Sequence, residues 1–247
     1  MRAMLEIIEV EFKMFLRLFV AVSFTLLFPV LLLLVFGGIY GNTPTKLFGG
    51  HGTVDVFFPA YTVMIIAVTG IMTLPISVCE YRERKILKRY KATPITPWHV
   101  FVSQIVVNVV MTALGIVLLF IVGKIVFNLQ FLGAFFPSIV AFFISLISVF
   151  SLGILIASVS SNTKTADVIA NLVYFPMIFL TGATVPIEVL PKLMVTISKF
   201  IPLTYAVNLL KGVWLGGKFL NYTKDITILI SITIASLLIS AFTFKWE

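Results

Sequence analysis

Six long stretches of the chain contain no Asp, Glu, Lys or Arg, and they constrain the fold more than any other feature of the sequence. They cover residues 18–45, 56–79, 92–123, 125–163, 168–187 and 226–244, so the shortest is 19 residues long. An α-helix needs about 20 apolar residues to cross a bilayer. Charged residues make up 11% of the chain and hydrophobic residues 60%, whereas soluble domains average about 25% and 45–50%. The sequence therefore predicts an integral membrane protein built from helices.

We expect one all-α transmembrane domain over residues 1–247, with six spans. The stretch 125–163, at 39 residues, is long enough for two spans. Asn128 and Gln130 near one end and the polar residues 160–162 near the other leave room for only one. The predicted spans are Leu18–Ile39, Phe57–Cys79, Val100–Val122, Leu132–Ser158, Ala166–Thr184 and Ile226–Phe244.

Residues 1–17 predict an amphipathic helix that lies in the membrane interface, as an elbow before the first span. On a helix their apolar side chains form one stripe with spacings of three and four, while Glu9 and Lys13 pair on the opposite side. Such a helix buries its apolar face among the acyl chains. A plain cytosolic extension of the first span is the alternative. The stripe consists of Leu5, Ile8, Phe12, Phe15 and Phe19.

The distribution of Lys and Arg predicts that both termini lie on the cytosolic side of the plasma membrane. Cytosolic loops are enriched in Lys and Arg, and this orientation places eleven of the 18 in the cytosol, six of them in 80–98. The net charge of +8 fits loops that lie beside anionic lipid head groups. We therefore expect a lipid bilayer, and no nucleic acid, as the partner of this charge.

The segment 185–225 is unusual for a loop between two spans. Lys199 and Lys211 flank eleven uncharged residues, FIPLTYAVNLL, which are too few to cross a membrane. We expect a re-entrant helix–turn–helix over 185–205 that dips into the outer leaflet between spans five and six. An amphipathic helix lying flat on the outer surface is the alternative. The prolines that divide the region into short units are Pro186, Pro191 and Pro202.

No predicted span carries Asp, Glu, His, Lys or Arg near its middle. Carriers coupled to an ion gradient and intramembrane hydrolases need an ionisable group inside the bilayer, so both classes are disfavoured. His51 and His99 have no companions at metal-ligand spacing, and neither Gly-Lys pair of the chain completes a G-x-x-x-x-G-K-[ST] phosphate loop. We expect no catalytic residue, metal or cofactor in this chain. If it transports, another polypeptide must supply the energy.

Eight of the chain's charged residues gather at 80–98. On a helix, Glu83, Ile86, Leu87 and Tyr90 share one face, and basic residues surround the rest. A narrow apolar stripe headed by a carboxylate suits docking into a groove of another protein. A cytosolic loop that only sets the topology is the alternative.

The segment 80–98 resembles the coupling helix of the type-2 ATP-binding-cassette (ABC) exporter permeases, with its Glu-x-Arg-Glu-Arg start and its Ala-Thr-Pro before the next span. Residues 175–191 and 201–214 are similar to the fifth span and the re-entrant pair of the same family. The resemblance covers essentially the whole chain in order. One departure is Lys85-Ile86, where the family commonly has Gly-Thr.

The resemblance implies that two six-span copies, identical or closely related, form a pore above two ATPase subunits that bind ATP and Mg²⁺. It also implies that the re-entrant segment closes the outer end of the pathway, with Pro186, Pro202 and Tyr205 at this gate. Closure of the ATPases would rock the spans and export a drug, an antibiotic, a natural product or a lipid. The residues that the resemblance places in the ATPase cleft are Glu80, Arg82, Glu83, Arg84, Leu87 and Arg89.

Aromatic side chains on spans two and five are candidates for the substrate pathway, because together they could line a wall for an amphiphilic cargo. The chain has 24 Phe residues, so packing against lipid and neighbouring helices is the alternative for each ring. The same architecture could export a polysaccharide or an ion, and a membrane scaffold that recruits a cytosolic partner without transport is a rival of another class. The candidate residues are Phe57, Phe58, Tyr61, Tyr174, Phe175, Phe179 and Thr181.

Overall fold

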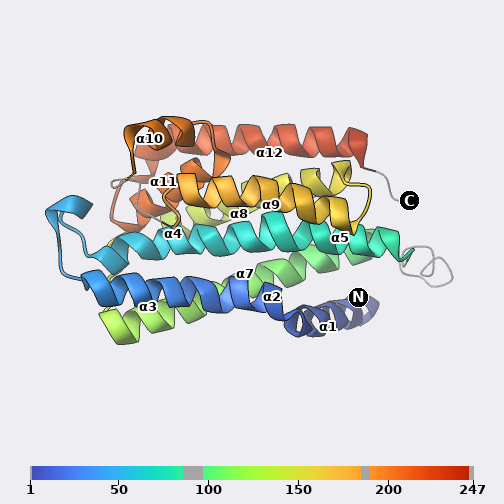
Figure 1. Cartoon of the computed structure of the whole chain (residues 1–247), viewed down its shortest axis with the longest axis horizontal. Coiled ribbons are helices and arrows are strands. Elements are labelled where there is room, and N and C mark those ends of the chain that lie inside the picture. The colour runs from blue at the N-terminus through green and yellow to red at the C-terminus, as the bar shows by residue number, and fades with distance from the viewer. Residues whose placement is uncertain (1, 86–96, 185–189, 245–247) are drawn as a thin grey trace.

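The computed structural model describes residues 2–85, 97–184 and 190–244, and every regular element in these ranges is a helix. Figure 1 shows a bundle of long helices that run roughly parallel to one another. In chain order the elements are α1 (Arg2–Arg17), α2 (Phe19–Val22), η1 (Ser23–Leu27), α3 (Phe28–Tyr40), η2 (Lys46–Phe48), α4 (Thr53–Ala67), η3 (Val68–Thr73), α5 (Leu74–Glu83), α7 (Pro97–Phe127), α8 (Phe135–Val159), α9 (Thr163–Leu180), α10 (Lys192–Ser198), α11 (Pro202–Trp214), η6 (Phe219–Tyr222) and α12 (Thr223–Thr243).

In the part of the chain that the structure describes, five helical stretches are long and apolar enough to cross a membrane, and they correspond to predicted spans one, two, three, four and six. The bent pair α10 and α11, whose axes meet at 97°, raises the number to at most six. The prediction of a multi-pass helical membrane protein is therefore confirmed. The five stretches are Phe19–Tyr40, Thr53–Glu83, Trp98–Phe127, Phe135–Val159 and Phe219–Thr243.

The fifth predicted span, Ala166–Thr184, corresponds to α9, which is not among these five stretches. This helix has 18 residues and carries Lys164 and Asp167 near its start. It nevertheless runs alongside the other long helices and packs against α5, η3 and α8 (Figure 1). Helix α9 is thus part of the bundle, while its role as the fifth of six spans stays a prediction.

Both termini lie at the same end of the bundle, which we call the terminal end (Figure 1). The end of α5 and the connection from α8 to α9 lie there too. The opposite end, which we call the distal end, carries the loop between α3 and α4 and the connection from α7 to α8.

The helix of predicted span two (α4, η3 and α5) is the core of the bundle. In an 18-residue stretch of this helix 83% of the residues are buried, against 17% in spans one and six. Its middle turn, η3, is π-helical, and Pro75 is the second residue after it. Proline lacks the N–H that a regular α-helix would use here. At this turn the helix approaches α8 so closely that a Cβ on Gly153 would lie 1.8 Å from the carbonyl oxygen of Gly70.

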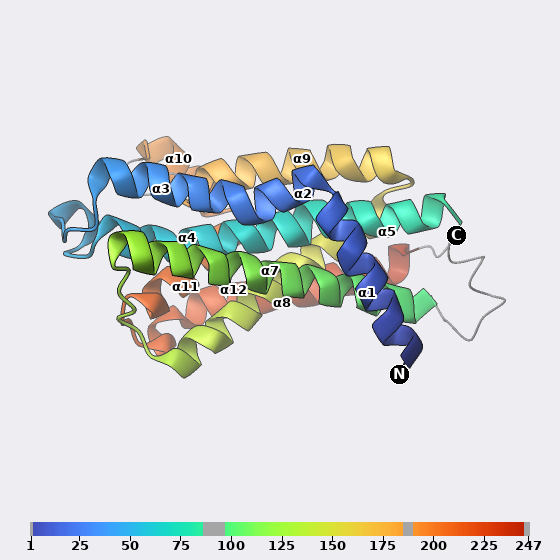
Figure 2. The same ribbon diagram turned by 90° about the horizontal axis from the view of Figure 1, so that it is seen from below.

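Helix α1 crosses the bundle obliquely at the terminal end and packs on α7 (Figure 2). The centre of its predicted apolar stripe supplies this contact, since Phe15 is only 5% exposed. The ends of the stripe, Leu5 and Phe19, are 63% and 78% exposed and remain available to lipid. The Glu9–Lys13 ion pair forms, with 2.6 Å between Oε1 and Nζ. Residues 2–17 are therefore an amphipathic helix as predicted, and its place in the membrane interface stays a prediction.

Candidate functional site

The last turn of α5, residues Glu80–Glu83, is the start of the predicted coupling segment, and we call it the hub turn. It continues the helix of span two, which ends at Glu83. Arg84 then has φ −75° and ψ 0°, and Lys85 has a positive φ of 53°, so the helix does not run on through these residues. Leu87 and Arg89 lie outside the described residues.

Arg82 fastens the hub turn to α8. Its Nη2 atom donates hydrogen bonds to the carbonyl oxygens of Ala157 (3.0 Å) and Ser160. These carbonyls lie at the end of α8, where a helix has no partners of its own for them and where a cation is favoured. The guanidinium also lies 5.6 Å from the centre of the Phe244 ring, just after α12. Arg82 thus binds within this chain.

Glu83 fastens the hub turn to α9. Its Oε2 atom accepts hydrogen bonds from the backbone N–H of Thr163 (3.0 Å) and from the Thr163 hydroxyl (2.6 Å). Thr163 is the first residue of α9, and the Asn162 side chain caps the same helix by accepting from Thr165 N (2.8 Å). A carboxylate at a helix N-terminus is stabilised by the unpaired N–H groups and by the helix dipole.

Tyr81, which the sequence interpretation did not single out, fastens the hub turn to α1. Its hydroxyl donates a hydrogen bond to Oε1 of Glu11. Burial raises the pKa of the Glu11 carboxyl, the Tyr81 hydrogen bond lowers it in part, and the nearby charge of Glu80 raises it further. A signal for Glu11 existed in the sequence, because it lies on the same face of the 2–17 helix as Ile8 and Phe15.

The hub turn therefore links α5 to three other helices. Tyr81, Arg82 and Glu83 are consecutive in the chain, and each contacts a different helix: α1, α8 and α9. Glu80 pairs with Arg84, with 2.7 Å between Oε1 and Nη2, and the Arg84 side chain is 67% exposed. Four of the six predicted coupling residues thus come together, and two of them hold neighbouring helices of this chain.

The predicted aromatic wall is not a continuous surface in this chain. Phe57, Phe58, Tyr61 and Tyr174 are each at most 4% exposed, whereas Phe175 and Phe179 are 45% and 56% exposed. The Phe57 ring lies edge-on to Phe36 at 5.6 Å, and the Phe58 ring lies 4.4 Å from Trp214. The four buried rings pack between helices, which is the alternative to a role in the substrate pathway.

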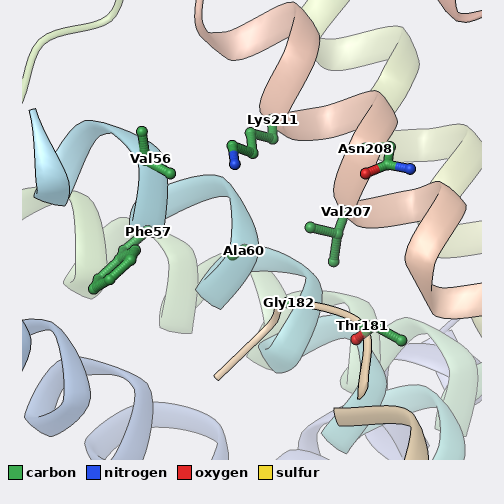
Figure 3. Close-up of a pocket in the computed structure, with 8 residues that line it drawn as sticks. All are labelled: Val56, Phe57, Ala60, Thr181, Gly182, Val207, Asn208 and Lys211. Carbon is green, nitrogen blue, oxygen red and sulfur yellow. The ribbon is translucent and has the colours of Figure 1, made fainter. Parts of the chain in front are cut away.

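Two of the candidates, Phe57 and Thr181, do line one pocket together, between α4, α11 and the turn after α9 (Figure 3). The Lys211 side chain extends from α11 toward α4 in this view. Among the described residues, the buried Thr181 hydroxyl has no hydrogen-bond partner. The remaining residues that line the pocket are Val56, Ala60, Gly182, Val207 and Asn208.

The predicted outer gate is described in part. Pro202 is the first residue of α11, a position where proline needs no N–H partner. The Tyr205 hydroxyl donates to the carbonyl oxygen of Lys199 (2.5 Å), which ties α11 to the end of α10. Pro186 lies outside the described residues.

A polar network at the distal end was also missed by the sequence interpretation. Asp55, only 5% exposed, accepts hydrogen bonds from Asn42 Nδ2 (3.1 Å) and from Gln130 N (2.9 Å). The Asn42 amide also donates to the carbonyl oxygen of Phe127 (3.2 Å) and accepts from Val54 N (3.0 Å). These bonds join spans one, two and three. Within the described residues, no three His, Cys, Asp or Glu side chains are grouped as metal ligands.

Comparison with known proteins places this architecture in a family. Residues 3–215 match the family model of the ABC-2 type transporter. The chain is similar to two proteins of Escherichia coli (strain K12), "Probable multidrug ABC transporter permease YbhR" (22% identical over 160 residues) and "Probable multidrug ABC transporter permease YbhS" (24% over 163). Each match covers 64% of this chain, and the chain spans 43% and 42% of those relatives, less than half of their length.

A third relative is "Nodulation protein J" of Rhizobium leguminosarum bv. viciae, 29% identical over 90 residues, which cover 36% of this chain and 35% of the relative. The family match extends from α1 to the residue after α11, so it includes the hub turn and every helix that the hub turn contacts through Tyr81, Arg82 and Glu83. The chain belongs to the ABC-2 type transporter family.

Proposed function

We propose that this chain pairs with a second copy, identical or closely related, to form the transport pathway of an ATP-driven exporter in the plasma membrane. Two separate ATPase subunits bind ATP and Mg²⁺, and this chain binds no cofactor itself. The cargo is a drug, an antibiotic, a natural product or a lipid, moved outward. The names of the two E. coli relatives support the multidrug class.

The hub turn is the observation that carries this proposal. The segment that begins at Glu80 docks on the ATPase, with Arg84, Leu87 and Arg89 in the contact. Arg82 and Glu83 then pass its displacement to α8 and α9, because charge-assisted hydrogen bonds join them to the ends of these helices. Movement of one cytosolic segment would thereby tilt three helices together.

The distal end is the outer side of the membrane in this proposal. The bent pair α10 and α11 is the re-entrant segment, and Pro186, Pro202 and Tyr205 belong to the gate that it forms. The helix α9 is the fifth span, so the chain crosses the membrane six times and both termini are cytoplasmic. The common position of the two termini at one end of the bundle supports an even number of crossings.

The function is tested by expressing the chain with a candidate ABC ATPase subunit and purifying any complex that the two form. Glu83→Ala should leave the assembled complex intact but remove the stimulation of ATP hydrolysis by amphiphilic dyes. Glu83→Gln is the matched control, since its amide oxygen still accepts from Thr163. Undiminished stimulation in Glu83→Ala would contradict the coupling role. A membrane scaffold without transport predicts that no ATPase is recovered at all.

A further inference from the structure

Helix α1 touches both helices that flank the predicted coupling segment. On one side, Tyr81 of α5 donates its hydroxyl proton to Glu11, and the two residues are only 8% and 7% exposed. On the other side, Phe15 packs in an apolar cluster with Val107 and Met111 of α7. Because residues 84–96 connect α5 to α7, α1 lies across the base of that segment.

The polar contact differs from the apolar one in how firmly it holds. An apolar surface permits small sliding motions, because dispersion attraction and hydrophobic burial have no fixed direction. A hydrogen bond fixes the two atoms that it joins within a narrow range of distance and angle. The Glu11–Tyr81 bond is therefore the contact that defines where α1 sits relative to the hub turn.

A small pocket lies beside this bond. Glu11 and Glu80 both line it, with Gln104 and Asn108 of α7. Among the described residues, Gln104 Nε2 and Asn108 Oδ1 have no hydrogen-bond partner, in side chains that are 3% and 2% exposed. Unpaired buried polar groups and two facing carboxyls are costly. Loss of the Glu11–Tyr81 bond would add another buried polar group without a partner, which favours its retention when α5 moves.

We propose that α1 is a brace across the base of the coupling segment, with Glu11 and Tyr81 as the positioning residues that make it move together with the hub turn. This inference rests on the proposed function, in which displacement of that segment drives transport. The apolar contact of Phe15 keeps α1 on α7, and the Glu11–Tyr81 bond transfers the motion of α5 to it. The spacing of α5 and α7 then stays constant while the segment between them is pushed.

The brace is tested by measuring the distance from α1 to the hub region with nitroxide labels. The background is Cys79→Ser, which removes the chain's one cysteine. Labels are attached at Leu16→Cys and Ser161→Cys, both exposed positions at the terminal end. Pulsed electron resonance on the chain in lipid nanodiscs should give one narrow distance distribution.

Removal of the Tyr81 hydroxyl in Tyr81→Phe should broaden this distribution about twofold, because α1 then samples nanosecond-to-microsecond excursions on its apolar contact. Glu11→Ala should do the same, whereas Glu11→Gln keeps an oxygen acceptor and should remain narrow. Glu9→Ala is the matched control, since the Glu9 side chain is 65% exposed and two residues away. A distribution as narrow in Tyr81→Phe and Glu11→Ala as in the parent would overturn the brace. If Tyr81→Phe fails to fold, the widths of the distance distributions of Glu11→Ala and Glu11→Gln still test the brace.

A second measurement separates failure of the brace from failure of the proposed function. In the complex with the ATPase, the label distance should stay constant in the parent when ATP is added, because α1 moves together with the hub turn, and it should shift in Tyr81→Phe while ATP hydrolysis continues. A distance that also stays constant in Tyr81→Phe would overturn the brace. If no ATPase associates with any variant, the proposed function fails, and the distance distributions without ATP still test the Glu11–Tyr81 contact.

Discussion

The two ends of the helix of span two are held in different ways. At the distal end every residue from Thr53 to Ala67 is buried, and the buried Asp55 accepts hydrogen bonds from two neighbouring segments. At the terminal end Glu83 is exposed and Arg82 half-buried, and single side chains reach out to separate helices. One end is enclosed by packing and the other is attached by a few polar contacts.

This difference indicates which end can move. Close-packed interiors resist displacement because each shift opens voids or forces overlaps. Partly solvated charged contacts contribute little to stability and exchange readily with water. The distal half of span two is therefore the fixed part of the bundle, and the hub turn is the adjustable part.

The largest loss of stability is expected from Asp55→Ala. The substitution leaves Gln130 N and one N–H of Asn42 without their acceptor, which should lower the free energy of unfolding by about 2–3 kcal/mol. Thermal unfolding of the purified chain in detergent measures the loss. Asp167→Ala, at an exposed position on α9, is the matched control and should change little. An Asp55→Ala protein as stable as the parent would remove the contrast between the two ends.

A smaller loss of stability, with a larger loss of coupling, is expected from Arg82→Ala. Because the guanidinium is half-buried, the two carbonyl contacts should contribute only about 1 kcal/mol. The stimulation of ATP hydrolysis in the complex should nevertheless disappear, since α8 no longer follows the hub turn. Arg82→Lys keeps the positive charge but lacks the planar guanidinium group, so it should recover part of the stimulation of ATP hydrolysis. Thermal unfolding and ATPase assays on the same samples give both quantities, and a stability loss larger than that of Asp55→Ala would reverse the comparison.

The smallest expected effect is on the pH dependence of thermal unfolding, to which the Glu11 carboxyl contributes. Burial and the charge of Glu80 raise the pKa of the Glu11 carboxyl, so the protonated form is favoured when α1 is docked. The stabilisation that the protonated Glu11 carboxyl gives to the folded state is therefore present at acidic pH and is lost as the pH rises through this pKa. Among the described residues that line this pocket, Glu80 and Tyr81 are the other titratable groups, and the α7 residues Gln104, Val107 and Asn108 carry no charge.

Glu11→Gln should accordingly remove this part of the pH dependence of thermal unfolding and resemble the acidic parent at neutral pH. Glu9→Gln should change the pH dependence of thermal unfolding in the opposite direction. Lys13 lowers the pKa of Glu9, so the stabilisation from this ion pair is lost as the pH falls. A pH profile of Glu11→Gln that overlays the parent would show that the carboxyl does not matter to the docking of α1.

The long helices could be predicted from sequence because an apolar stretch without charges has few other places to lie than inside a membrane. The role of α9 as a span was harder to predict, because Lys164 and Asp167 lie in the first turns of this helix, which nevertheless packs in the bundle. Charge spacing also located the hub turn, since Glu80, Arg82 and Glu83 stand out directly after a long uncharged span.

What the hub turn contacts could not be predicted. The partner of Glu83 is 80 residues further along the chain, and that of Tyr81 is 70 residues before it. Such pairs depend on how the helices are arranged, which local pattern does not encode. Spacing also could not separate the two interpretations of the aromatic candidates, because a Phe that lines a pathway and a Phe that fills a helix contact have identical spacing.

The π-helical turn η3 makes the length of span two as important as its composition. Each residue of an α-helix turns the chain by about 100°, so η3 sets the rotational phase between the distal half and the hub turn. Loss or gain of one residue there would leave Asp55 in its network yet rotate Tyr81, Arg82 and Glu83 away from α1, α8 and α9. The residue count of span two between Asp55 and Tyr81 is therefore fixed by the need to aim three neighbouring side chains at three different helices.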